Sequence, residues 1–143
     1  MKLIFFLILS LFIVSCDQSK SIETTSQNFG SQSEKTKFLK DYIKLEQENF
    51  VELDFYINYQ DNSTGMVPAP NDWGVYIIAR VEDIHPWINN KEKLKSKPKD
   101  LDLKKVKTNI NYSKISEWFS FGQDDYIGID RQNKIIVYIN QTY

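Results

Sequence analysis

The chain has 143 residues and a formal net charge of −1, with 18 basic and 19 acidic side chains. This near-neutral charge argues against a nucleic-acid-binding protein, which usually carries a basic domain. Cys16 is the only cysteine in the sequence, so an intramolecular disulfide is excluded and the fold must be stabilised by packing. The length suits one domain with its own hydrophobic core.

The chain begins with a short apolar run. Lys2 precedes an almost uninterrupted apolar stretch at residues 3–14, which ends at Ser15 and Cys16. A membrane-spanning helix needs about 20 apolar residues, whereas the hydrophobic region of a secretory signal needs about 7–15. The pattern therefore predicts an export signal over residues 1–15.

Ile13, Val14, Ser15 and Cys16 end this run and resemble the lipobox of bacterial lipoproteins. The resemblance implies cleavage before Cys16, a diacylglycerol on its thiol and often a third acyl chain on the new amine. Asp17 resembles the inner-membrane retention signal of enterobacterial-type lipoproteins. We therefore expect a protein anchored by acyl chains in a bacterial membrane, facing the periplasm or the exterior. The alternatives are an ordinary cleaved signal with Cys16 as a free thiol, and an uncleaved anchor.

The stretch after the cysteine is polar. Residues 17–33 are mostly Ser, Gln, Thr, Asn, Lys and Glu, a composition that buries too little apolar area to offset the entropy of ordering. We expect residues 16–33 to be a flexible tether and residues 34–143 to form a single α+β domain.

Residues 34–45 have helical periodicity, with Ser33 as the expected N-cap. One face of this expected helix carries Phe38, Leu39, Tyr42, Ile43 and Leu45. The helix is expected to end near Glu46, which would otherwise point into the apolar face.

Two strands and a short helix are expected next. Residues 51–59 alternate between apolar and polar side chains, which is typical of a strand with one buried face. Residues 73–81 are apolar on both faces and are expected to be central in the sheet. Residues 82–88 begin with two acidic side chains and contain Pro86, which favours a short helix.

Residues 89–109 are rich in lysine, and Pro98 argues against one continuous helix there. Three interpretations of this segment stay open: a solvated loop, a contact with anionic lipid headgroups, and a docking surface for an acidic protein. The candidate contact residues are Lys91, Lys93, Lys95, Lys97 and Lys99.

The end of the chain is again apolar. A helical turn is expected over residues 115–119, and the runs at 126–130 and 134–140 predict a terminal β-hairpin. The predicted fold class is α+β: an N-terminal helix and a short middle helix on a mostly antiparallel sheet of three to five strands, ending in this hairpin.

The sequence shows no assembled catalytic or metal site. His85 is the single histidine, and without cysteines it does not make a zinc site. Asp124 and Asp125 form one carboxylate pair, and Asp100 and Asp102 another. Acidic residues at turns are common because they bond the backbone, so no cofactor or metal is predicted.

These observations favour a non-enzymatic, lipid-anchored binding protein of the cell envelope, similar in design to inhibitor or immunity lipoproteins. The expected partners are the membrane, through Cys16, and an envelope or secreted protein. One alternative is a cell-wall hydrolase with Asp124, Asp125 and His85 as candidates. Another is a structural component of the envelope.

Overall fold

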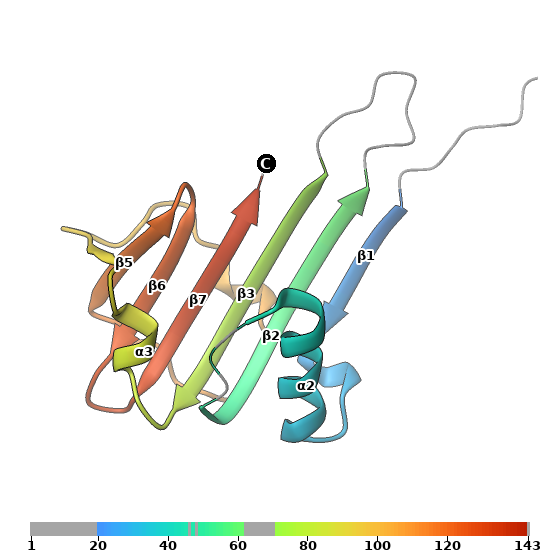
Figure 1. The fold of residues 1–143 in the computed structure, drawn as a ribbon, viewed down its shortest axis with the longest axis horizontal. Coiled ribbons are helices and arrows are strands. Elements are labelled where there is room, and N and C mark those ends of the chain that lie inside the picture. The colour runs from blue at the N-terminus through green and yellow to red at the C-terminus, as the bar shows by residue number, and fades with distance from the viewer. Residues whose placement is uncertain (1–19, 46, 48, 62–70, 143) are drawn as a thin grey trace, which may run out of the picture.

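The computed structural model describes residues 20–45, 47, 49–61 and 71–142. Within these residues the main element is one antiparallel sheet of seven strands, in the order β1-β2-β3-β7-β6-β5-β4 (Figure 1). The strands are β1 (Lys20–Thr25), β2 (Phe50–Asp61), β3 (Asp72–Val81), β4 (Glu92–Lys93), β5 (Glu117–Gly122), β6 (Asp125–Asp130) and β7 (Ile135–Thr142).

Helices cover one face of this sheet. They are α2 (Gln32–Ile43) and the one-turn α3 (His85–Ile88). Two 3₁₀ turns complete the described elements, η2 (Ser26–Asn28) after β1 and η3 (Leu103–Lys105) between β4 and β5. The segment that contains η3 crosses the sheet on the face opposite to α2 and α3 (Figure 1).

The chain is therefore mainly β, and the predicted α+β class with an N-terminal helix is wrong. Among the described residues only α2 is longer than one turn, and β1 precedes it. The expected three to five strands are seven, because β1, β4 and β5 were not predicted. β5 occupies the place of the helical turn expected over residues 115–119.

The remaining predicted elements are present with shifted bounds. The expected helix at 34–45 is α2, the strands at 51–59 and 73–81 are β2 and β3, and the short helix is α3. β3 lies inside the sheet, between β2 and β7, as its two apolar faces predict. β6 and β7 pair antiparallel and form the expected hairpin.

The tether predicted for residues 16–33 is too long. Residues 20–33 belong to the fold, as β1, η2 and the start of α2. β1 is polar, so its composition resembles a linker, but all six of its residues pair with β2, from Lys20 opposite Asp61 to Thr25 opposite Tyr56. Residues 1–19, with the expected signal and Cys16, lie outside the described residues.

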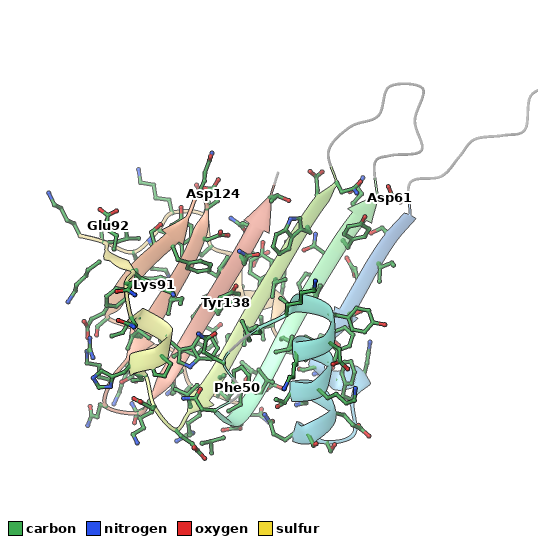
Figure 2. All side chains as sticks on the ribbon, in the orientation of Figure 1. Phe50, Asp61, Lys91, Glu92, Asp124 and Tyr138 are labelled. Carbon is green, nitrogen blue, oxygen red and sulfur yellow. The ribbon has the colours of Figure 1, made fainter. Side chains whose placement is uncertain are left out.

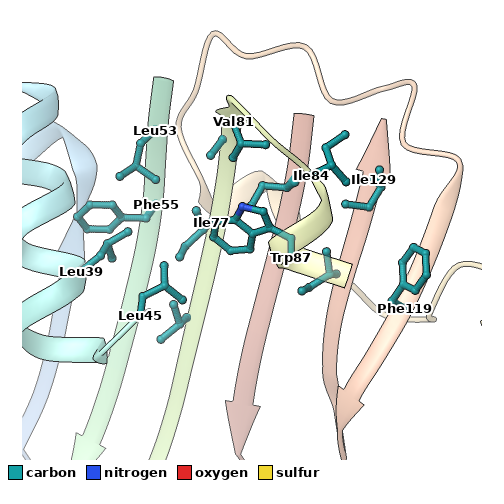
Figure 3. Packing of buried hydrophobic residues seen from close by; sticks show 14 residues of the cluster. Leu39, Leu45, Leu53, Phe55, Ile77, Val81, Ile84, Trp87, Phe119 and Ile129 are labelled. Atoms are coloured by element: carbon teal, nitrogen blue, oxygen red, sulfur yellow. The ribbon is translucent and has the colours of Figure 1, made fainter. Parts of the chain in front are cut away.

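The sheet has a hydrophobic core on each face. On the helix side, Leu39 of α2 and Trp87 of α3 pack against strand residues such as Phe55 and Ile77 (Figure 3). On the other side, Leu103, Val106 and Ile110 of the segment between β4 and β5 complete a second cluster. Because both faces are covered, the central strands are apolar on both sides.

Candidate functional site

The lysine-rich segment is attached to the sheet. The Leu94 N–H donates to the Trp118 carbonyl at 2.8 Å, and β4 pairs with β5. The Lys93 ammonium lies 2.8 Å from a Glu117 carboxylate oxygen. This segment is thus a packed cover of the sheet that carries lysines on its outer side.

The five candidate lysines differ in their surroundings. The Lys91 ammonium lies 5.4 Å from the centre of the Phe121 ring, and that of Lys97 lies 6.0 Å from a ring of Trp118. Lys95 and Lys99 are exposed. Lys91, Lys93 and Lys97 therefore have partners within the chain, whereas headgroup or protein contacts of the segment stay a prediction.

Of the carboxylates of the hydrolase alternative, Asp124 lies in the turn between β5 and β6, and Asp125 is the first residue of β6 (Asp124 is labelled in Figure 2). Asp124 adopts a positive φ of 59° and accepts a hydrogen bond from the Tyr126 hydroxyl. Asp125 accepts one from the Gln141 backbone N–H at 3.1 Å. Burial raises the pKa of Asp125, and the charge of Asp124 adds to that effect. Both carboxylates thus support the local backbone and hairpin.

His85 lies far from this pair. His85 follows the C-terminal end of β3. At that end Arg80 pairs with Ile135 of β7, and Ile135 pairs in turn with Asp130, the last residue of β6. Asp125 is the first residue of β6 and so lies at the opposite end of the sheet's strands. The His85 ring nitrogen and backbone N–H both lie 3.0 Å from Asp83 Oδ1. The backbone N–H of His85, more than its ring, lowers the pKa of Asp83. Asp83 thus bonds His85, the first residue of α3, and the three hydrolase candidates are not brought together.

Two features are absent from the described part of the chain. No group of three or more His, Cys, Asp or Glu side chains there could hold a metal ion. No helix there is long and apolar enough to cross a membrane. Asp100 and Asp102 accordingly belong to no metal-binding group of the described residues.

The structure instead shows a groove that the sequence analysis did not predict. It lies on the helix side of the sheet, beside the C-terminal end of α2, and has a volume of about 890 Å³. Strands β1, β2, β3 and β7 form its floor. Its lining residues are Ile22, Thr24, Phe38, Tyr42, Ile43, Ile57, Asn58, Tyr59, Trp73, Val75, Tyr138 and Asn140.

The rim of this groove exposes large apolar side chains. Tyr42 is 77% exposed, Ile22 58% and Tyr59 37%, and all three line the groove. Val51 is the remaining exposed large apolar side chain among the described residues, and it lies elsewhere on β2. Apolar side chains gathered in this way mark binding surfaces more often than single exposed ones do.

No Lys, Arg, His, Asp or Glu is among the described residues that line the groove. Tyr138 lies near the middle of the sheet in Figure 2 and stacks on Phe121 at 5.2 Å between ring centres. Burial, with a smaller contribution from Asp125, raises the pKa of Tyr138 to about 12. The Tyr138 hydroxyl therefore stays protonated, and the described residues that line the groove are uncharged at physiological pH.

Only part of the groove has a sequence signal. Ile57, Tyr59, Trp73 and Val75 stand at the inward positions of predicted strands, and such residues are usually core. Ile22 lies within residues 16–33, for which the sequence predicts a flexible tether. The groove exists because α2 ends at Ile43, before it covers the whole floor, and sequence periodicity does not show how far a helix extends over a sheet.

Comparison of the chain with protein-family models, with curated proteins and with solved structures found no match.

Proposed function

We propose that this chain is a lipid-anchored, non-enzymatic binding protein of the bacterial cell envelope, and that the groove beside α2 is its binding site. Cys16 is the lipidated residue. The observation that carries the proposal is the groove itself, a hollow whose described lining residues are uncharged and whose rim exposes apolar side chains. Its volume of about 890 Å³ is within the range of about 300–1,000 Å³ that is common for small-molecule sites.

The chemistry of the groove favours binding over catalysis. Among the described residues, its polar side chains are Thr24, Trp73, Asn140 and tyrosines, none of which is a general base at neutral pH. An apolar site of this kind binds by removing apolar surface from water, and its few polar groups orient what it binds.

The anchor is tested by labelling. Labelled palmitate should be incorporated into the wild-type chain and not into Cys16→Ala, and only the wild-type chain should fractionate with membranes. Palmitate labelling that persists in Cys16→Ala, or equal membrane association of the two chains, would contradict the anchor.

The binding site is tested with a dye that fluoresces in apolar surroundings. The full chain should enhance its emission, and Ile22→Asp should reduce that enhancement, because it places a charge on the groove wall. Val51→Asp is the matched control, since Val51 is 54% exposed and Ile22 58%, but Val51 lies outside the groove. Equal dye binding by the two variants would contradict the proposed site.

A further inference from the structure

We infer that the groove binds an acyl chain of a membrane phospholipid, taken from the bilayer in which Cys16 is anchored. This inference rests on the proposed function, because it uses the position of the anchor. It goes further by naming both the chemical class of the ligand and its source.

The position of β1 places the groove close to the anchor. β1 begins at Lys20, four residues after Cys16, and four residues span at most about 14 Å when fully extended. Ile22 and Thr24 of the same strand line the groove. A domain whose first strand follows the acylated residue so closely keeps this part of its surface beside the bilayer.

The lining of the groove suits a hydrocarbon chain. Phe38, Ile43, Ile57 and Val75 offer apolar surface, and none of the described residues that line the groove is charged. Each methylene that leaves water for such a surface adds to binding. A polypeptide would bring backbone N–H and C=O groups that need partners, whereas β2, β3 and β7 under the groove are already paired on both sides, so an acyl chain is the better-matched occupant.

The rim has the composition of a membrane interface. Tyr42, Tyr59 and Trp73 combine an apolar ring with a polar group, and such residues are enriched where hydrocarbon meets headgroups. The Tyr42 ring stacks on Phe38 with 4.6 Å between the ring centres, and because the residue is 77% exposed it still offers surface that can contact lipid. The rim therefore fits a surface at which an acyl chain leaves the bilayer and enters the groove.

Fluorescence quenching tests the inference. The full lipidated chain is reconstituted in phosphatidylcholine vesicles that contain a phospholipid brominated in the middle of one acyl chain, because bromine quenches tryptophan at contact. Trp73 lines the groove, whereas Trp87 and Trp118 are buried in the two cores. Wild type should be quenched, Trp73→Phe should lose most of that quenching, and Trp118→Phe should keep it.

A groove-filling variant separates entry into the groove from contact with the membrane surface. Thr24→Phe occupies the floor of the groove and should raise the brominated-lipid fraction needed for half-quenching about tenfold, as expected when roughly two methylenes lose their site. Ser21→Phe is the matched control, because Ser21 is on the same strand and points to the other face. It should leave quenching unchanged.

The outcomes distinguish the two proposals. Vesicle flotation of wild type but not of Cys16→Ala, without quenching of Trp73, would leave the anchor standing and overturn the acyl-chain inference. Flotation of Cys16→Ala together with the vesicles would overturn the anchor. Trp73 would then be measured on the floated protein: quenching would support the acyl-chain inference, and its absence would overturn it. Quenching that is equal in Thr24→Phe and Ser21→Phe would overturn it. A cross-linked dimer would also overturn the inference if it forms in wild type without quenching of Trp73 and is lost in Thr24→Phe. In that case a second copy of the chain would fill the groove.

Discussion

Gly128 shows how closely side chains pack on the lysine-rich side of the sheet. It pairs with Trp118 of β5, and a Cβ at Gly128 would lie 2.9 Å from two atoms of the Trp118 ring. The same Cβ would lie 2.7 Å from Cγ2 of Ile115. Because Gly128 has no side chain, the Trp118 indole can lie directly over β6 and pack into this core.

We therefore expect Gly128→Ala to lower the free energy of unfolding by about 1–3 kcal/mol, because the added methyl overpacks this site. Urea unfolding measures the change. Gly30→Ala is the control, since the nearest atom to a Cβ at Gly30 is Glu34 Oε2 at 3.5 Å. A Gly128→Ala protein as stable as wild type would contradict the packing described here.

Glu117 joins three elements through its carboxylate. It accepts hydrogen bonds from Arg131, with Nη2 at 3.1 Å, and from Lys93 at 2.8 Å. These bonds, that from Arg131 above all, lower the pKa of Glu117 from 4.5 to about 2. The carboxylate therefore stabilises the fold when it is ionised.

The stability that Glu117 contributes should depend on pH. Because its pKa is lower in the folded state, the contribution is complete above pH 4.5 and is lost as the pH falls towards 2. Arg131 and Lys93 are about half exposed, so we expect wild type to lose only about 1 kcal/mol more than Glu117→Gln over this range. Urea unfolding at several pH values measures it. Glu92→Gln is the control and should follow wild type, and a Glu117→Gln curve parallel to wild type would refute the pH dependence.

At the scale of one element, the N-cap of α2 is Ser31, two residues before the expected N-cap Ser33. The Ser31 hydroxyl accepts from the Glu34 N–H at 3.2 Å, and the Glu34 carboxylate accepts from the Ser31 N–H. This capping box was readable in the sequence as Ser31 followed three residues later by Glu34. The apolar periodicity begins only at Phe38, so it does not by itself distinguish Ser31 from Ser33 as the N-cap.

The cap gives a direct comparison of two serines. Ser31→Ala should lower the free energy of unfolding by about 1 kcal/mol, because backbone N–H groups at the start of α2 lose their acceptor. Ser33→Ala, inside the first turn, should change it by less than about 0.5 kcal/mol. Thermal unfolding followed by circular dichroism measures both, and a larger effect of Ser33→Ala would favour the cap expected from the sequence.

At the scale of the whole molecule, the lysine-rich segment is one of the two covers of the sheet. Its lysines are on the outside, while Leu103, Val106 and Ile110 are almost completely buried against β3 and β7. The segment has almost no regular structure, with only the two residues of β4 and the single turn of η3, so its order depends on these contacts.

Leu103→Ala should therefore lower the free energy of unfolding by about 3 kcal/mol through the cavity it leaves. It should also speed cleavage by trypsin after the lysines of this segment, which the folded protein protects. Lys104→Ala, an exposed neighbour, should leave the stability unchanged. Rapid cleavage of the wild-type segment under native conditions would show that it does not hold to the sheet.

The sequence by itself determined β2, β3, α2, α3 and the terminal hairpin. In each of them the local order of apolar and polar residues, or a recognisable turn, indicates which side chains are buried. It also supplied the expected anchor at Cys16, which depends on neighbouring residues alone. Only the tertiary structure decided that β1 is a strand, since its hydrogen bonds come from β2, more than thirty residues away. It also decided that the lysine-rich segment covers a core and that α2 leaves a groove open. Those features depend on contacts between segments that are far apart in the sequence. The local sequence of a helix or loop does not show how much of the sheet that helix or loop will cover.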